Sequence, residues 1–522
     1  MKSSILPASV DISPGDFDSA TANEPESDPH DILTLDAVPP NVADALIKVY
    51  IEKVLPQYPF FLEEDLYLYQ ALVYHGAKTV NADLQRRAEF VVTMMMAIST
   101  LTSKSPNHHR LMSFSQSLYR FAMQRYDTLS ASTLCHLQCT MLLCQFANFC
   151  PAIAEVWTLK GMAVRMAIAL GLHKEPDAAL GIFDQKQSEL RRQIFWTLYS
   201  MDRSISITAH RAVSIEDDLV DVGWPYQNLD AEVLSLRPGR ETQTIRFLRH
   251  VRFRQIQSEI FAVNFQSKDP SILPYSEWMK AKDAELMEWR RSLDMLHDTG
   301  FDWFDFVTYT GQLYLHMHCP RNPHPDTTSV LTGFDAVNGI ADGYLRMLHR
   351  GFLKFDWHCA HQATAAGVLL IRSVKDHYQT LLRCHSSREV NDVLDKYSEI
   401  LMLLTDRWPT ASVCQQKFEG LKHDLFVAFS LSADILLNSG AAAQRIPSGD
   451  SVPTSLTAPG ELPLATFPLG LAATGEQTAT DADQVFDTTD LDSWAYTINV
   501  FRDYTDQDWD IMAGQAEMHW PF

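Results

Sequence analysis

The amino-acid sequence predicts an all-α protein in which one large multi-helix domain lies between two disordered acidic tails. Apolar residues recur at the three- and four-residue spacing of amphipathic helices through most of the chain. Strand-like runs with hairpin dipeptides are absent from the sequence, and so is the alternation of strands and helices that builds parallel sheets. The two ends lack the helical pattern and are rich in acidic, small and polar residues.

The N-terminal tail covers residues 1–40. It carries eight acidic residues and one lysine, and it has few large apolar residues before Ile32. Such a segment cannot bury enough apolar surface to offset the entropy lost on ordering the chain. We therefore expect residues 1–40 to be disordered.

Residues 41–440 are expected to fold, either around one large core or as two fused lobes, because about 400 residues exceed the usual size of a single core. No apolar run reaches the length of a membrane span, so no membrane association is expected. Besides a central pair of helices, helical stripes are expected at residues 42–55, 84–100, 109–126, 132–149, 246–262, 275–296, 309–318, 332–349, 360–384, 387–405 and 411–437.

The first helix of the central pair follows the sequence EVWTLKGMAVRMAIALGLHKEP. Trp157, Gly161, Val164 and Ile168 fall on one face of this helix. Gly171 comes directly after the last periodic residue, where the left-handed backbone of a helix stop favours glycine. The helix is predicted to end there in a Schellman motif.

The second helix of the pair follows the sequence ELRRQIFWTLYSMDRSISITAHR. Asp184 or Ser188 is the expected N-cap, because short polar side chains accept hydrogen bonds from the first free N–H groups of a helix. Since both helices are amphipathic and close in sequence, they should pack together. Five apolar residues recur on one face of the second helix: Leu190, Ile194, Leu198, Met201 and Ile205.

The block at residues 155–225 resembles the fungal-specific transcription factor domain, the middle homology region of fungal zinc-cluster regulators. The similarity rests on W–x3–G–x3–R, on LGLH, on ELRRQIFWTLYSMDR and on an Asp-rich segment before Pro225. Weaker similarity extends over roughly residues 39–439. The matching residues are Trp157, Gly161, Arg165, Leu170, Gly171, Leu172, His173, Arg191, Arg192, Phe195, Trp196, Asp202, Arg203, Asp217 and Pro225.

Two departures from the family pattern stand out. Where such proteins usually have Gly-Arg-Pro, this sequence has His210, Arg211 and Ala212, which puts the geometry of that turn in question. Members of the family usually carry a six-cysteine binuclear zinc cluster near the N-terminus that contacts DNA. Here the first cysteine is Cys135, so we expect no such cluster and no cofactor in this chain.

The charged residues of the second central helix allow two interpretations. Arg192 and Arg203 fall on nearly one face, with Asp202 adjacent, so a charge network through Arg165 or Asp217 is expected to hold this helix in place. The resemblance implies instead that this region keeps the protein inactive or receives a small-molecule effector. We favour the structural role over direct ligand contact.

Direct DNA binding by this chain alone is not expected, because its formal net charge is −22 and DNA affinity depends on neutralising phosphates. The one basic run, residues 237–254, is interpreted as a solvated or salt-bridged helix face with Arg246, Arg249 and Arg254 at the surface. DNA contact would then be indirect. It would come from a zinc-cluster partner or a homodimer, or from a zinc cluster missing from this sequence.

Enzyme chemistry is not indicated, because no G-x-S-x-G, H-E-x-x-H, P-loop or G-x-G-x-x-G motif is present. Cys135, Cys139 and Cys150 lie along apolar helical sequence and are expected to be small buried hydrophobes rather than zinc ligands. Two histidine-rich spots could ligate a metal but are interpreted as local histidines near helix ends: His316, His318, Cys319 and His324, and His358, Cys359 and His361.

The C-terminal tail divides into a disordered linker, residues 441–482, and an acidic-aromatic segment, residues 483–522. Alternation of acidic and apolar residues is typical of disordered activation segments that present apolar side chains to a coactivator. A terminal helix that packs back on the domain is the alternative. The apolar residues concerned include Phe486, Leu491, Trp494, Phe501, Tyr504, Trp509 and Ile511.

These observations lead to two hypotheses of function. The first is a nuclear fungal transcriptional regulator, of a metabolic or biosynthetic pathway, that acts through its helical domain and contacts a coactivator or the transcription machinery. The second is a ligand-binding or protein-interaction module on the same scaffold, without transcriptional output. Nuclear localisation is implied by the resemblance.

Overall fold

The computed structural model describes residues 35–443, except residues 78, 80, 103–107, 127, 130–132, 150–152, 177–180, 227–239, 267, 270–272, 293–302, 352 and 354. The described residues form α-helices joined by loops and short 3-10 or π turns, with two isolated β-bridges and no strand. This confirms the predicted all-α class. The predicted disorder of residues 1–34 and 444–522 lies outside the described residues.

The ordered body begins earlier than expected. Residues Leu35–Ala37 form a 3-10 turn, and Leu35 and Val38 are buried among apolar residues of the first helices. Burial of these two side chains explains why order starts before residue 41, since each contributes apolar area to the core.

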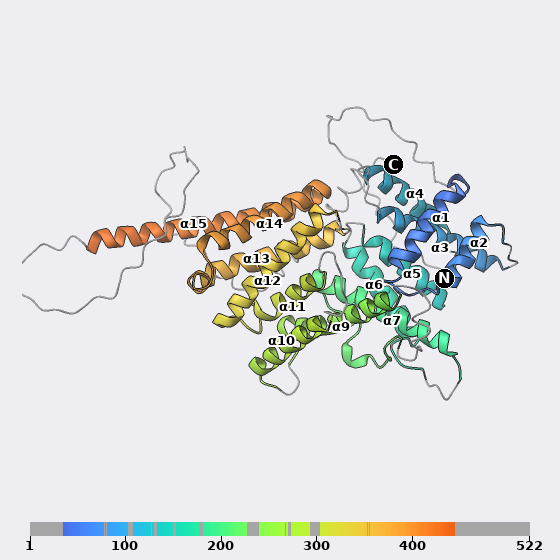
Figure 1. The fold of residues 1–522 in the computed structure, drawn as a ribbon, viewed down its shortest axis with the longest axis horizontal. Helices are drawn as coiled ribbons and strands as arrows, with labels where there is room; N and C mark the ends of the chain where they lie inside the picture. Colours follow the sequence, from blue (N-terminus) through green and yellow to red (C-terminus); the bar gives the residue numbers. More distant parts are fainter. Residues whose placement is uncertain are drawn as a thin grey trace, which may run out of the picture.

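The N-terminal helices form one end of the molecule (Figure 1). At the centre of this end, α3 packs against α1, α2, α4 and α5. Helix α2 was not predicted from the sequence: its buried residues Leu66, Tyr69 and Leu72 share one face but lie within the ambiguous run LYLYQALVY. The bounds are α1 Pro40–Val49, a π turn at Tyr50–Val54, α2 Glu63–Tyr74, α3 Ala82–Leu101, α4 His108–Tyr126 and α5 Leu134–Ala147.

Three long helices follow and lie between the two ends of the molecule in Figure 1. They are α6 Ile153–Ala169, α7 Gln185–Thr208 and α9 Arg240–Phe265. The predicted central pair is present: α6 packs on α7, and α7 packs in turn on α9. All five apolar residues predicted to line the second helix are buried in α7.

The C-terminal helices form the other end of the molecule, and the last of them extends past its neighbours (Figure 1). Helices α12, α13 and α14 all pack against one another, and α15 lies along α13 and α14. Their bounds are α10 Tyr275–Arg291, α11 Trp303–His316, α12 Thr327–His349, α13 Asp356–Leu381, α14 Ser387–Arg407 and α15 Ser412–Ala443.

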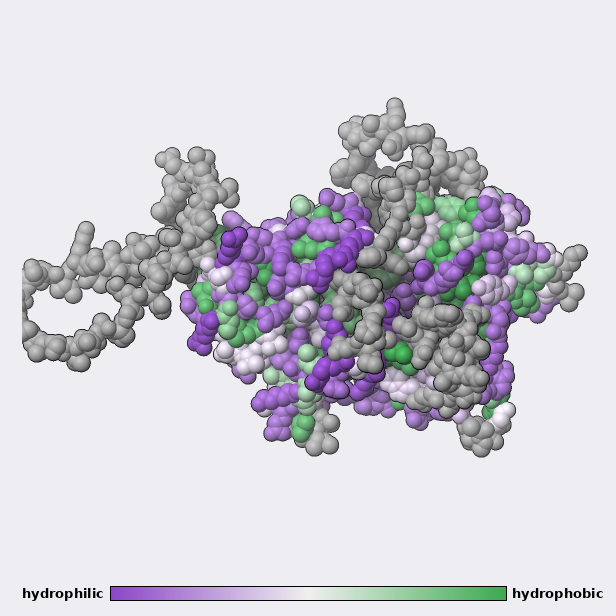
Figure 2. Space-filling model, viewed as in Figure 1, coloured by the Kyte–Doolittle hydropathy of each residue, from purple (hydrophilic) through white to green (hydrophobic). Residues whose placement is uncertain are grey.

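The buried apolar residues gather in two large cores, which agrees with the alternative of two fused lobes. The N-terminal core draws on residues from Leu35 to Val251, and the C-terminal core on residues from Ile207 to Leu425. Helices α7 and α9 contribute to both cores, and a small cluster of Val156, Ile205 and Trp357 lies apart from either. The two lobes therefore share α7 and α9 as a common support. On the face drawn in Figure 2, hydrophilic and hydrophobic residues are interspersed over the described surface.

Candidate functional site

Helix α6 ends as the sequence predicts. Gly171 has a φ of 68°, in the left-handed region that glycine tolerates best. The Gly171 N–H donates to the Ile168 carbonyl at 2.9 Å, and the Leu172 N–H donates to the Ala167 carbonyl at 2.9 Å. These are the two hydrogen bonds of a Schellman motif.

Arg191 of α7 covers this helix end. Its Nη2 donates to the Leu170 carbonyl at 2.8 Å, and its guanidinium lies 4.2 Å from the centre of the Phe183 ring. A cation at the carboxyl end of a helix is favoured by the free carbonyl groups there. Arg191 therefore fixes α6 to α7 at the turn that follows Gly171.

The segment after Gly171 pairs with the Asp-rich loop that follows α7. The Asp221 N–H donates to the His173 carbonyl at 2.9 Å, and the Glu175 N–H donates to the Asp221 carbonyl at 2.7 Å. These bonds form an isolated parallel bridge at Lys174 and Asp221. Burial, and to a smaller extent the charge of Lys174, lowers the pKa of His173.

Arg192 and Trp196 hold the same loop from the side of α7. Arg192 Nε lies 3.1 Å from both carboxylate oxygens of Glu175, and the Gly223 N–H donates to Glu175 Oε2 at 2.8 Å. The hydrogen bonds from Arg192 lower the pKa of Glu175. Trp196 Nε1 donates to the Gly223 carbonyl at 2.9 Å, and its ring stacks on Trp224 with centroids 4.9 Å apart.

The start of α7 has the predicted cap. Asp184 accepts a hydrogen bond from the Gln187 N–H at 2.7 Å, and the Gln187 side chain accepts one from the Asp184 N–H at 3.1 Å. This is a capping box, and it selects Asp184 over Ser188 as the N-cap.

Asp202 lies in the protein interior, and both of its carboxylate oxygens accept hydrogen bonds. Its Oδ1 accepts from the Ser214 hydroxyl at 2.6 Å, and its Oδ2 accepts from the Ser214 N–H at 3.0 Å. Arg203 Nη1 lies 3.1 Å from the same Oδ2. Both Asp202 and Arg203 have 0% relative exposure, so they form a buried ion pair, and each hydrogen bond to the carboxylate is short.

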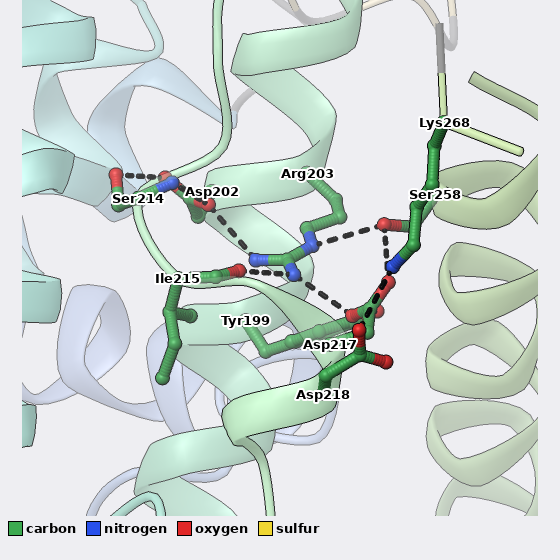
Figure 3. A network of polar contacts seen from close by, with 9 residues as sticks. All are labelled: Tyr199, Asp202, Arg203, Ser214, Ile215, Asp217, Asp218, Ser258 and Lys268. Atoms are coloured by element: carbon green, nitrogen blue, oxygen red, sulfur yellow. Dashed lines mark hydrogen bonds and ion pairs between the residues drawn. The ribbon is translucent and has the colours of Figure 1, made fainter. Parts of the chain in front are cut away.

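Arg203 also reaches the start of the Asp-rich loop (Figure 3). Its Nη2 donates to the Ile215 carbonyl at 2.6 Å and to Asp217 Oδ1 at 2.8 Å. The Tyr199 hydroxyl donates to the same Oδ1 at 2.7 Å, and the Ser258 hydroxyl of α9 donates to Asp217 Oδ2 at 2.8 Å.

This network joins three parts of the chain: α7, the loop at residues 214–218 and α9. Both carboxylates in it accept hydrogen bonds from more than one donor, and these donors lie on different segments. The arrangement therefore acts as a clamp between segments.

The predicted charge network is present, but the partners differ in part. Arg203 pairs with Asp217, one of the two expected partners, whereas Arg165 is exposed on α6. Arg192 belongs to a separate ion pair with Glu175, although its spacing from Arg203 suggested one shared face.

Trp157 and Gly161 stand beside this network on α6. A Cβ built on Gly161 would lie 3.5 Å from Ser214 Oγ, an ordinary contact. The Arg211 guanidinium lies 4.8 Å from the centre of the Trp157 ring. Both residues thus adjoin the segment that follows α7.

Helix α7 ends in a second Schellman motif, with histidine at the position that favours glycine. His210 has a φ of 49°. Its N–H donates to the Ile207 carbonyl at 3.2 Å, and the Arg211 N–H donates to the Ser206 carbonyl at 2.8 Å. The turn therefore keeps its geometry despite the departure from the family pattern, at the cost of a left-handed non-glycine residue.

One expectation about the basic run is wrong. Arg254 was expected at the surface of its helix, yet it is 9% exposed and lies on the buried face of α9. The buried face of α9 is lined by Phe247, Val251 and Ser258, which sets Arg254 on the same side. Arg252, two residues earlier, is the exposed arginine of this turn.

The histidine-rich spots do not form clusters of ligands. His316 lies 3.3 Å from Ser329 and 3.2 Å from Asp283, while His318 Nδ1 lies 2.8 Å from the Pro323 carbonyl. Over the described parts of residues 35–443, no group of three or more His, Cys, Asp or Glu side chains is placed to hold a metal ion. Of the described helices, none combines the length and the hydrophobicity needed to cross a membrane.

The acidic-aromatic segment at residues 483–522 lies outside the described residues. Within them, sequence reasoning missed Glu175, Ser214 and Ser258 as members of the site. Glu175 could have been found as an acidic residue directly after the LGLH stop. Ser214 and Ser258 carry no sequence signal, because their roles depend on how the segments pack.

Comparison with known proteins gives a consistent match. Residues 47–291 match the family model described as the fungal specific transcription factor domain. Pyrimidine pathway regulatory protein 1 of Saccharomyces cerevisiae is 21% identical over 281 residues, 50% of this chain and 30% of that protein. The negative regulator of pleiotropic drug resistance STB5 of Candida glabrata is 26% identical over 224 residues, 42% of this chain and 21% of that protein.

The matched regions therefore span less than a third of these two relatives. The activatory protein CHA4 of Saccharomyces cerevisiae is 28% identical over 152 residues, 26% of this chain and 22% of that protein. Among solved structures, the K. lactis CBF3 core is similar with a TM-score of 0.49 and 12% identity, over 77% of this chain and 86% of that chain.

Proposed function

We propose, from the premise that residues 47–291 form a fungal specific transcription factor domain, that this chain is the regulatory part of a fungal transcriptional regulator. The observation that carries the proposal is the coincidence of this family match with the clamp described above. The family-signature residues Arg191, Arg192, Asp202 and Arg203 all lie on α7 and bind the segments on either side of it. The relatives are named as regulators of transcription or of pathways, and the proposal includes no catalytic activity and no bound cofactor.

The described domain would act as a rigid regulatory body rather than as the DNA reader. Its clamp joins helices that contribute to both cores, so a change at one core is passed to the other through α7 and α9. DNA contact is proposed to come from a zinc-cluster partner, from a second copy of the chain, or from a zinc cluster outside these 522 residues. Action in the nucleus is part of the same proposal.

The acidic C-terminal segment is proposed to contact a coactivator or the transcription machinery. Residues 441–522 hold thirteen acidic and two basic residues, and the aromatic residues lie between the aspartates. Charge keeps such a segment solvated while the apolar side chains remain available to a groove on a partner.

A reporter experiment tests this proposal. Residues 441–522 are fused to a neutral DNA-binding domain, and reporter output is measured in a fungal host. We expect activation, and we expect it to be lost when Trp494, Phe501 and Trp509 are replaced by alanine. Residues 441–482, which contain a single aromatic residue, Phe467, serve as the control.

Silence of the 441–522 fusion would favour the second function, a ligand-binding or protein-interaction module without transcriptional output. Localisation of the full chain tagged with a fluorescent protein provides an independent test of nuclear action. Exclusion of the tagged chain from the nucleus would contradict the proposal.

A further inference from the structure

Two cations are buried where α6, α7, α9 and α13 meet, beside the small cluster of Val156, Ile205 and Trp357. Lys160 of α6 is 2% exposed, and Arg254 of α9 is 9% exposed. Burying a charge is costly unless an opposite charge lies beside it. The role of this junction therefore depends on which groups lie beside the two cations.

Lys160 has one hydrogen bond to a neutral partner. Its Nζ donates to Asn148 Oδ1 at 2.9 Å, and the Asn148 carbonyl accepts from Trp357 Nε1 at 2.7 Å. Burial is the main influence on Lys160 and lowers its pKa to about 8. An amide oxygen satisfies one proton of the ammonium group but supplies no compensating charge.

Arg254 likewise contacts neutral groups. Its Nη1 donates to Gln257 Oε1 at 2.6 Å, and its Nη2 donates to Ser204 Oγ at 3.2 Å. Its Nε–H is buried and has no acceptor among the described residues. A guanidinium with an unused N–H donor can bind a planar anionic group by donating a hydrogen bond to it.

His358 of α13 lies near both cations and is affected by their charges. Its Nε2 lies 3.2 Å from the Ser204 hydroxyl and 2.9 Å from the Thr208 hydroxyl. Burial, and next the nearby charges of Arg254 and Lys160, lower the pKa of His358 to about 3, so the ring is neutral near pH 7. Ser204 thus touches both His358 and Arg254.

The two carboxylates of the adjoining clamp already have partners. Asp202 influences Lys160, but its oxygens accept from Ser214 and Arg203. Asp217 accepts from Arg203 and from the Tyr199 and Ser258 hydroxyls. Among the described residues of this region, Lys160, Arg203 and Arg254 are buried cations, and the carboxylates of Asp202 and Asp217 both pair with Arg203.

We propose that this junction binds the anionic group of a small molecule, a carboxylate or a phosphate, between Lys160 and Arg254. The anion would supply the missing charge and accept from the Arg254 Nε–H. The buried Trp157 Nε1–H, which has no partner among the described residues, is a further donor on the same helix as Lys160. Binding itself is independent of the proposed function, whereas its regulatory effect rests on that function.

The consequence for the fold follows from the elements involved. An anion held by Lys160, Arg254 and the Ser204 hydroxyl would connect α6, α9 and α7, and α13 through His358. Because α7 and α9 contribute to both cores, the ligand would stabilise one arrangement of the two lobes over others.

The test uses the full chain with inorganic phosphate and with citrate as probes, each against chloride at equal ionic strength. Thermal unfolding and isothermal titration calorimetry are recorded for the wild type, Lys160→Met, Arg254→Gln and the matched control Arg252→Gln. Arg252 lies on the same helix, is exposed, and pairs with Glu285. We expect phosphate or citrate to raise the unfolding temperature of the wild type and of Arg252→Gln.

Loss of one charged hydrogen-bond donor should weaken the apparent affinity of Lys160→Met and Arg254→Gln by about tenfold or more. A response to phosphate alone would identify a phosphoryl compound, and a response to citrate alone would identify a carboxylate. No response of the wild type to either probe, or an equal response of all four proteins, would overturn the proposal.

A second readout covers the case in which Arg254→Gln fails to fold. Without added anion, Lys160→Met should unfold at a higher temperature than the wild type, because it removes an uncompensated buried charge. A lysine kept for structure alone would give the opposite shift, and a lower unfolding temperature for Lys160→Met would count against a binding site.

Discussion

Arg203 and Asp217 form an ion pair at the centre of the molecule, with Nη2 and Oδ1 2.8 Å apart. The guanidinium is wholly buried, and the carboxylate also accepts from Tyr199 of the same helix and from Ser258 of α9. The pair thus joins α7 to the loop that follows it and, through Ser258, to α9. Residues that carry the resemblance to the fungal specific transcription factor domain are in this way also residues that hold the central helices together.

Replacing Asp202 by asparagine should destabilise the protein by about 3–5 kcal/mol, because Arg203 would lose its buried counter-charge and keep only the partly exposed Asp217. Chemical denaturation of the full chain measures this change. Asp218→Asn is the control: Asp218 is 81% exposed and pairs with Lys268 at 3.1 Å, so its loss should cost less than about 0.5 kcal/mol. If Asp202→Asn keeps wild-type stability while reporter output changes, the prediction that Asp202 has a structural role is wrong.

The two signature glycines of α6 should respond in opposite ways to alanine. Gly171→Ala places a Cβ on a left-handed residue and should cost about 1–2 kcal/mol. Gly161→Ala sits inside the helix, where the new Cβ has only ordinary contacts, and should be neutral or stabilise by up to about 1 kcal/mol. Equal effects of the two substitutions on the denaturation midpoint would show that the stop at Gly171 contributes nothing.

Two substitutions of His210 separate the free-energy cost of its left-handed backbone from the contribution of its side-chain packing. Its ring lies 5.7 Å from Phe261 and 6.4 Å from Phe265 between centroids, and both His210→Gly and His210→Ala remove these contacts. Glycine accepts the left-handed φ and alanine does not, so His210→Gly should be more stable than His210→Ala by about 1 kcal/mol. Thermal unfolding of the two variants gives the difference directly, and a more stable alanine variant would contradict it.

Lys160 should make stability depend on pH in the alkaline range. Its pKa is lowered to about 8 by burial, from an ordinary 10.5, so between these values the unfolded chain binds more protons than the folded one. Stability from this group therefore rises as pH rises from 8 to 10.5, and its cost is greatest below pH 8.

At pH 7, Lys160→Met should be more stable than the wild type by about 2 kcal/mol, after allowing for the hydrogen bond to Asn148. The advantage should shrink by pH 10. Urea denaturation at both pH values measures it, with the exposed Lys268→Met as the control. An advantage that does not change with pH would mean that the charge of Lys160 is not its source.

Local features of the fold were predictable to within a few residues. The Asp184 cap and the Gly171 stop of the central pair are where the sequence placed them, because both depend on hydrogen bonds within four or five residues. Helix α2 was missed, since its run of alternating Leu and Tyr does not distinguish a helix from a strand. Residues 47–291 match the family model of the fungal specific transcription factor domain, which agrees with the resemblance that the central block carries.

The partners of the charged residues were less predictable. Periodicity suggested one network on one face of α7, but Arg192 pairs with Glu175 and Arg203 with Asp217. Periodicity also assigned Arg254 to the solvent, because Ile245, Leu248, Val251 and Gln255 fall at helical spacing and leave Arg254 on the remaining surface. The fold instead places it against Ser204 of α7, 50 positions away in sequence.

The sequence by itself thus determined most of the helices, the caps of the central pair and the resemblance to the fungal specific transcription factor domain, since these depend on neighbours within a few residues and on patterns repeated along the chain. The tertiary structure decided which charges meet. Ser258 reaches Asp217 across 41 positions, and His358 reaches Ser204 across 154. Whether a buried cation lies beside an opposite charge depends on such distant contacts. Only the packed fold shows that Arg203 is paired with carboxylates, whereas Lys160 and Arg254 have neutral hydrogen-bond partners.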